Sequence, residues 1–218
     1  MFTTRFEAWV RRRAEALMSA LGRIPITPNQ ITVIGVALTF AAAVLAALAH
    51  LRWAGVVLIF AGTFDILDGA LARSSGRAYP YGAFLDSTLD RYSEGAIYIG
   101  LAAYFAGTNG PLQRWLLLAT VAALAGSFLV SYVRARAQSL GFTCESGIFA
   151  RPERVVATVV GLIFGGAVLY IVVFMLAILT NLTALQRIHE VWLQGRAQRI
   201  AREREAAAAP KAGNTVTP

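Results

Sequence analysis

The sequence is poor in charged residues and in cysteine. Only 15% of its 218 residues are charged, while 57% are hydrophobic, and soluble domains carry about 25% charged residues. With a mean hydropathy of +0.58, the composition excludes a small soluble enzyme and a disordered chain. The single cysteine, Cys144, excludes a disulfide-stabilised scaffold. The composition therefore indicates an integral membrane protein.

The few charges that are present are distributed unevenly. Of the 20 basic residues, 19 are arginine. The chain has only four aspartates, and all of them fall within 26 residues: Asp65, Asp68, Asp86 and Asp90. We expect no nucleic-acid partner and look to the membrane and to the aspartates for function.

The hydrophobic segments predict an all-α fold with six transmembrane helices. A spanning helix needs about 20 mostly apolar residues, and residues 29–51, 53–72, 82–107 and 112–133 each meet this requirement. The charge-free run 155–186 is too long for one span. Extended to 152–192, it accommodates two helices, with Gly165-Gly166 as a tight hairpin between them.

The positions of the basic residues predict the orientation. With six spans, 18 of the 20 basic residues lie on one side, and only Arg52 and Arg114 lie opposite. The positive-inside rule makes the richer side cytoplasmic. We therefore expect a multi-pass protein of the plasma membrane with both termini in the cytoplasm. Five spans would instead put the arginines of the C-terminal tail outside.

Three regions follow from this topology. Residues 1–24 are predicted to form a cytoplasmic juxtamembrane amphipathic helix whose arginines meet anionic headgroups; its arginine triplet is explained about as well by simple positive-inside flanking charge. Residues 25–193 form the six-helix domain. Residues 194–218 form a charged, alanine-rich cytoplasmic tail, expected to be a frayed helix that leads into disorder.

The four aspartates lie at membrane depth, where each ionisable residue costs about 2.5–3.5 kcal/mol on insertion scales. Asp65 and Asp68 are three residues apart, and Asp86 and Asp90 four apart, so each pair occupies one helix face. Because the two helices are antiparallel neighbours joined by a short loop, the faces can meet near the cytoplasmic surface. Four such anions need compensating positive charge. Oxygen-only ligands favour a pair of Mg²⁺ ions, with Mn²⁺ as the alternative.

Two further roles for the aspartates account for less of the pattern. Structural salt bridges to Arg73, Arg77 or Arg91 would involve one or two of them, but not all four. A cation transporter would hold its carboxylates near the bilayer midplane, between internal repeats or broken helices. Glu94, one turn beyond Asp90, either orients a ligand or pairs with Arg91.

One continuous motif runs from Asp65 to Asp90. It consists of Asp65-Ile-Leu-Asp68-Gly69-Ala-Leu-Ala72-Arg73, eight further residues, and Gly82-Ala-Phe-Leu-Asp86-Ser-Thr-Leu-Asp90. It resembles the signature of the CDP-alcohol phosphatidyltransferase family, D-x2-D-G-x2-A-R-x8-G-x3-D-x3-D, at every fixed position. Thr27-Pro28-Asn29-Gln30-Ile31-Thr32 resembles the T-P-N-x-I-T element of the same family. The resemblance covers roughly residues 25–192.

The resemblance implies a reaction in which an alcohol hydroxyl attacks the β-phosphorus of a CDP-linked lipid such as CDP-diacylglycerol, and CMP leaves. It implies that the four aspartates divide two metal ions between them, and that Asp90 is also the general base. It further implies a homodimer embedded among membrane lipids. By family position and residue chemistry, the CDP-lipid would be bordered by Asn29, Gln30, Ile31, Thr32, Gly69, Ala72, Arg73, Tyr79 and Gly82.

The sequence after residue 130 points to a phosphorylated polyol as the acceptor. Arg134, Arg154 and Arg187 begin or end predicted spans on the cytoplasmic side and could bind a phosphate together. Arg151 and Ser131 are weaker candidates for the same pocket. The pattern S-Y-x-[KR]-A-R-A, R-P-E-R and Q-R-x-H resembles the phosphatidylinositol-phosphate synthase branch, which uses inositol 1-phosphate. The alternatives are a phosphatidylglycerophosphate synthase using glycerol 3-phosphate, or another acceptor alcohol.

Overall fold

The computed structural model describes residues 28–74, 79–144 and 146–208, and every regular element in these residues is a helix. The helices are α2 (Pro28–Ala47), α3 (Leu51–Ser74), α4 (Pro80–Ala106), α5 (Gln113–Ser139), α6 (Arg151–Phe164) and α7 (Gly166–Ala208). Three of them contain stretches long and apolar enough to cross a membrane: Asn29–Ala47, Gln113–Ser139 and Gly166–Ala206. The all-helical prediction is confirmed for the described residues. The amphipathic helix predicted within residues 1–24 lies outside them.

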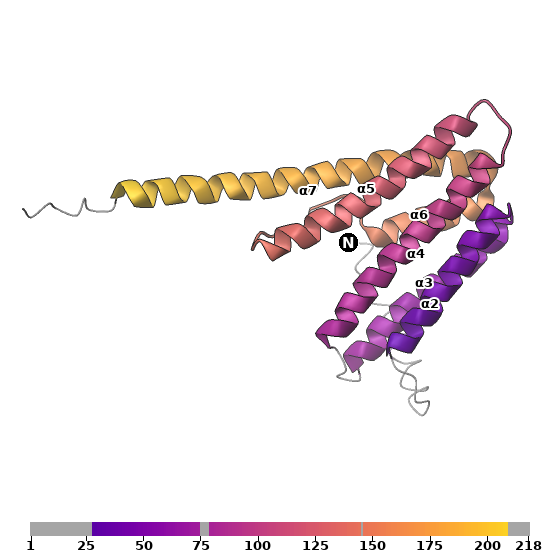
Figure 1. Cartoon of the computed structure of the whole chain (residues 1–218), viewed down its shortest axis with the longest axis horizontal. Helices are drawn as coiled ribbons and strands as arrows, with labels where there is room; N and C mark the ends of the chain where they lie inside the picture. The colour runs from indigo at the N-terminus through magenta and orange to yellow at the C-terminus, as the bar shows by residue number, and fades with distance from the viewer. Residues whose placement is uncertain (1–27, 75–78, 145, 209–218) are drawn as a thin grey trace, which may run out of the picture.

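The helices pack in two groups that meet at α4. Helix α2 packs against α3 and α4, while α5 packs along α7 (Figure 1). Helix α4 contacts α5, and α6 contacts both α3 and α7. Small residues allow close approach, as in other membrane bundles: a Cβ atom added to Gly100 would collide with the backbone of Ala43. The core combines buried alanines of α2 and α3 with Leu101, Phe105 and Leu169.

The last hydrophobic block is divided at the predicted position. Gly165 ends α6 with φ 64°, and Gly166 begins α7 with φ 49°. Both values lie in the left-handed region that glycine adopts without a steric penalty. Helix α6 has only 14 residues, about 21 Å at 1.5 Å per residue, which is shorter than the hydrocarbon core of a bilayer, about 30 Å thick.

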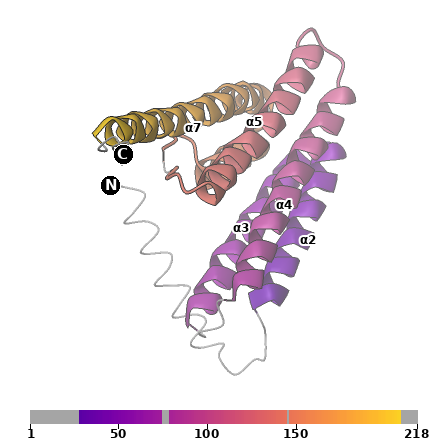
Figure 2. The same cartoon turned by 60° about the vertical axis from the view of Figure 1, so that its left-hand side comes forward.

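Helix α7 continues beyond the last predicted span. It runs for 43 residues to Ala208 and extends well beyond the other helices (Figure 2). Residues 194–208, expected to belong to a fraying tail, continue the helix. They are rich in alanine, arginine, glutamine and glutamate, which all favour helix, and Arg199 pairs with Glu203 one turn later at 3.2 Å.

The connection between α5 and α6 is held against α7. Thr143 donates to Gln194 through both its backbone N–H and its hydroxyl, each at 3.1 Å, and Gln194 donates back to the Thr143 carbonyl at 2.7 Å. Ser146 donates to Glu190 at 2.6 Å from its hydroxyl. Cys144 lies beneath, 1% exposed, and this burial raises the pKa of its thiol. The side chain therefore behaves as a small packed hydrophobe.

Candidate active site

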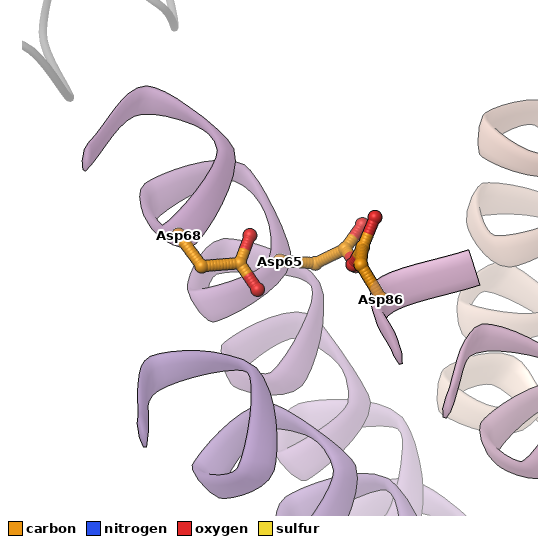
Figure 3. A group of neighbouring side chains, drawn as sticks. All are labelled: Asp65, Asp68 and Asp86. Carbon is orange, nitrogen blue, oxygen red and sulfur yellow. The ribbon is translucent and has the colours of Figure 1, made fainter. Parts of the chain in front are cut away.

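Three of the four carboxylates predicted to meet converge where the end of α3 meets the start of α4. Oxygen atoms of Asp65, Asp68 and Asp86 all lie within 4.8 Å of one another (Figure 3). Asp65 and Asp68 come from one face of α3, and Asp86 reaches toward Asp65 from the first turns of α4. The donor set consists of carboxylate oxygen alone, which suits a hard divalent cation such as Mg²⁺ or Mn²⁺. These residues therefore fit the predicted metal.

The start of α2 completes this end of the bundle. Thr32 donates a hydrogen bond of 2.5 Å from its hydroxyl to Oδ2 of Asp68, which is only 5% exposed. Asn29 lies near Gly82, because a Cβ atom at Gly82 would come within 3.7 Å of the Asn29 Oδ1 atom. The T-P-N-x-I-T element and the aspartate signature, separate in sequence, thus belong to one site. A hydrogen bond of this kind fixes the orientation of a metal-binding carboxylate.

The other residues predicted to border the CDP-lipid are described to different extents. Gln30 is exposed and Ile31 is buried at the start of α2. Tyr79 is 68% exposed and immediately precedes α4. The backbone of Gly69, Ala72 and Arg73 belongs to the last turns of α3, but their side chains lie outside the described part of the chain. The roles of all these residues stay predictions.

Asp90 lies one turn beyond Asp86 and has a different partner. Its Oδ1 atom accepts from Nη2 of Arg151 at 2.6 Å, and the same arginine donates from Nη1 to Oδ2 of Asp65 at 3.1 Å. Arg91, the neighbour considered from sequence, is 3.9 Å from the other Asp90 oxygen. Arg151 at the start of α6 thus bridges the carboxylates of α3 and α4. Sequence reasoning considered Arg151 only as a weaker acceptor ligand, since nothing in its spacing indicated that α6 begins beside the aspartates.

The three arginines predicted to hold the acceptor phosphate differ in exposure. Arg154 is 3% exposed and donates from Nε and Nη2 to the two carboxylate oxygens of Glu94, at 2.6 and 3.2 Å. Arg187 is 6% exposed and donates to the carbonyls of Val130 and Ser146, at 2.6 and 2.9 Å. Arg134 is exposed. Two of the three guanidinium groups are therefore engaged with the protein, as buried charges must be.

The same three arginines nevertheless lie within electrostatic reach of one another. Arg187 experiences the positive charges of both Arg134 and Arg154. Ser131, half-buried, precedes Arg134 by three residues on α5. The structure thus gathers one exposed and two buried arginines, from the last turns of α5, the start of α6 and the middle of α7. It also answers the question about Glu94, whose partner is Arg154 on another helix.

Comparison with known proteins decides the family. Residues 25–193 match the sequence model of the CDP-alcohol phosphatidyltransferase family. The chain belongs to the CDP-alcohol phosphatidyltransferases. Among its relatives in this family are the phosphatidylinositol phosphate synthase of Mycobacteroides abscessus and the archaetidylinositol phosphate synthase of Pyrococcus horikoshii. The first is 37% identical over 80% of this chain and 81% of the relative, and the second is 38% identical over 83% and 92%.

The solved structures agree with the family assignment. A crystal structure of the Mycobacterium tuberculosis phosphatidylinositol phosphate synthase with CDP-DAG bound superposes with a TM-score of 0.76 at 33% identity, covering 83% of this chain and 94% of the other. A second structure of that enzyme, in complex with manganese and citrate, gives a TM-score of 0.74 at 33% identity over 82% and 88%. This phosphatidyltransferase is therefore a transferase with the helical arrangement of those proteins.

Proposed function

We propose that this phosphatidyltransferase transfers a phosphatidyl group from CDP-diacylglycerol to a hydroxyl of inositol 1-phosphate and releases CMP. The observation that carries the proposal is the complete aspartate signature, three of whose carboxylates converge within 4.8 Å. Two relatives with 37% and 38% identity are named phosphatidylinositol phosphate synthase and archaetidylinositol phosphate synthase. A solved relative binds CDP-DAG. No observation favours a cation transporter.

The acceptor hydroxyl oxygen forms a bond to the β-phosphorus of the donor, the bond from that phosphorus to the bridging oxygen breaks, and CMP leaves. Asp90 accepts the hydroxyl proton as general base; its side chain is 15% exposed, at the edge of the carboxylate cluster. Asp65, Asp68, Asp86 and Asp90 would hold two Mg²⁺ ions, with Mn²⁺ as the alternative. Bound there, the ions would neutralise the pyrophosphate and the charge that develops on the leaving group.

The CDP-lipid would lie where the ends of α2, α3 and α4 meet. Asn29 and Thr32 belong to this end through their contacts with Gly82 and Asp68. The absence of a side chain at Gly69 allows a nucleotide to approach the helix backbone, and the guanidinium fork of Arg73 suits a phosphate oxygen. Gln30, Ile31, Ala72 and Tyr79 complete the proposed donor pocket.

The acceptor phosphate would bind at the arginines of α5, α6 and α7. Arg134 is the exposed member and makes the direct contact. Arg187 is buried, donates to backbone carbonyls and adds positive potential behind Arg134. Arg154 is neutralised by Glu94 and positions the start of α6 beside this pocket. Ser131 and Arg151 border the same region. This division of roles favours an acceptor that already carries a phosphate over a neutral polyol.

The proposed cellular setting follows from the charge distribution. Six membrane-spanning helices place both termini and the active site on the cytoplasmic side of the plasma membrane. In this topology α6 is one of the six membrane-spanning helices although it is short. The end of α7 extends into the cytoplasm. A homodimer is part of the proposal, as the family implies.

The acceptor is tested with the purified full-length protein in detergent, supplied with CDP-diacylglycerol and Mg²⁺. Inositol 1-phosphate, free inositol, glycerol 3-phosphate and serine are compared as acceptors by CMP release. We expect the highest kcat/KM with inositol 1-phosphate. A preference for glycerol 3-phosphate would make the protein a phosphatidylglycerophosphate synthase. A preference for free inositol would contradict the proposal that the arginines bind an acceptor phosphate.

A further inference from the structure

Arg151 has an unusual position for a cation. It is the first residue of α6, where the helix dipole is positive and disfavours a positive side chain. Its guanidinium instead points to the signature aspartates, bonding Asp65 at 3.1 and 3.3 Å and Asp90 at 2.6 Å. The helix dipole therefore does not favour an arginine at this position, whereas the negative charges of Asp65 and Asp90 do.

The bridge joins groups that otherwise repel each other. Asp65 and Asp90 come from different helices; Asp65 belongs to the cluster with Asp68 and Asp86, and Asp90 lies within electrostatic reach of Asp65 and Asp86. In a partly buried site, like charges this close are strongly unfavourable. A guanidinium fork that bonds one carboxylate with each terminal nitrogen compensates both charges at once. Arg151 therefore supplies the positive charge that the cluster needs when no ion neutralises it.

The same bridge obstructs an ion. Mg²⁺ binds oxygen ligands at about 2.0–2.1 Å, and a guanidinium held against the same carboxylates would face that ion at short range with like charge. Arg151 engages both oxygens of Asp65 and Oδ1 of Asp90. An ion that takes these oxygens therefore competes with the guanidinium for them.

The geometry points to Arg151 as an internal counter-cation of the signature aspartates, bridging Asp65 and Asp90 in the metal-free protein and displaced from them when divalent metal binds. Once released from the two carboxylates, the guanidinium fork would suit a phosphate oxygen of the substrate. This inference rests on the proposed metal site and is independent of which acceptor the enzyme uses.

The test compares Mn²⁺ affinity and thermal stability of the detergent-solubilised full-length protein with those of two variants. Arg151→Gln removes the bridging charge. Arg91→Gln is the matched control, because it removes a neighbouring charge that lies 3.9 Å from Asp90 but does not bridge two carboxylates. Free Mn²⁺ is measured by electron paramagnetic resonance in a titration of EDTA-stripped protein, so the readout does not depend on turnover.

We expect Arg151→Gln to bind Mn²⁺ about tenfold more tightly than wild type, and Arg91→Gln to change affinity by less than about threefold. In EDTA the Tm of Arg151→Gln should fall below that of wild type, and saturating Mn²⁺ should remove most of this deficit. Arg151→Lys keeps the charge but cannot bridge both carboxylates, so its Mn²⁺ affinity should lie between those of wild type and Arg151→Gln.

Two results would overturn the inference. One is an unchanged or weaker Mn²⁺ affinity in both Arg151 variants. The other is a Tm deficit that is the same in EDTA and in Mn²⁺, which would give Arg151 a purely structural role. If wild-type protein itself bound no divalent metal, the metal site of the proposed function would fall with it. Metal binding by wild type without competition from Arg151 would leave the proposed function intact.

Discussion

Arg154 and Glu94 form a two-point ion pair between α6 and α4. The Nε and Nη2 atoms of the arginine lie 2.6 and 3.2 Å from the two carboxylate oxygens, and Nη1 donates to the Phe149 carbonyl at 3.2 Å. The arginine is 3% exposed and the glutamate side chain 11%. Glu94 lies one turn after Asp90 on the same helix, so this pair fixes the start of α6 relative to the proposed general base.

Replacing Glu94 with glutamine should destabilise the fold strongly. The change leaves the buried Arg154 charge without its counter-ion, and breaking a buried pair in this way costs about 3–5 kcal/mol. Thermal unfolding in detergent measures the effect. Glu203→Gln is the control, since the Arg199–Glu203 pair is 82% and 64% exposed and its loss should leave Tm unchanged. Equal Tm values for the two variants would show that the Glu94 pair does not stabilise the fold.

Thr32→Val should weaken metal binding. Valine has nearly the shape of threonine but cannot donate to Asp68, and loss of such a supporting bond typically costs about tenfold or more in metal affinity. Reactivation of EDTA-stripped enzyme by increasing Mg²⁺ measures it. Thr39→Val is the matched control on α2, where the hydroxyl bonds only the Gly35 carbonyl. An unchanged Mg²⁺ requirement in Thr32→Val would mean that this bond does not orient Asp68.

Asp90→Asn should abolish transfer while leaving CDP-lipid binding largely intact. The amide cannot accept the hydroxyl proton, and general base catalysis contributes about a hundredfold or more. Turnover and binding of CDP-diacylglycerol are measured on the same preparation. Ser87→Ala, which removes only a hydroxyl bonded to the Phe84 carbonyl, should keep its activity. Turnover within a few-fold of wild type in Asp90→Asn would remove Asp90 from the base role.

Arg134→Ala should raise the KM for inositol 1-phosphate about tenfold or more and leave the KM for CDP-diacylglycerol unchanged. Arg134 is the exposed arginine of its group, and a charge-assisted phosphate contact is worth this much. Arg136→Ala controls for the loss of positive charge near the end of α5, since Arg136 bonds Ser139 on its own helix. A parallel rise in both KM values would show that Arg134 does not distinguish acceptor from donor.

Much of the fold could be predicted because hydrophobic length and helix breakers are local signals. The Gly165-Gly166 pair divides the last hydrophobic block where the structure divides it. The convergence of Asp65, Asp68 and Asp86 also followed from spacing on two adjacent helices. The point at which the helix ends could not be predicted, because the charged residues after 193 indicate the end of a membrane span but are also good helix formers.

The long-range partners could not be predicted. Arg151 meets Asp65 and Asp90, and Arg154 meets Glu94, across separations of 86 and 60 residues for the bonds to Asp65 and Glu94. No periodicity within one helix carries that information, since it depends on how α6 packs against α3 and α4. For the same reason, arginines with similar sequence surroundings proved to be buried in two cases and exposed in the third.

The central claim is that the aspartate cluster transfers a phosphatidyl group to an acceptor that keeps its own phosphate. The most direct measurement supplies inositol 1-phosphate labelled with radioactive phosphorus, together with unlabelled CDP-diacylglycerol and Mg²⁺, and follows the label into the lipid extract. We predict that labelled lipid and free CMP form in equal amounts. CMP release with all the label left in the aqueous phase would contradict the account.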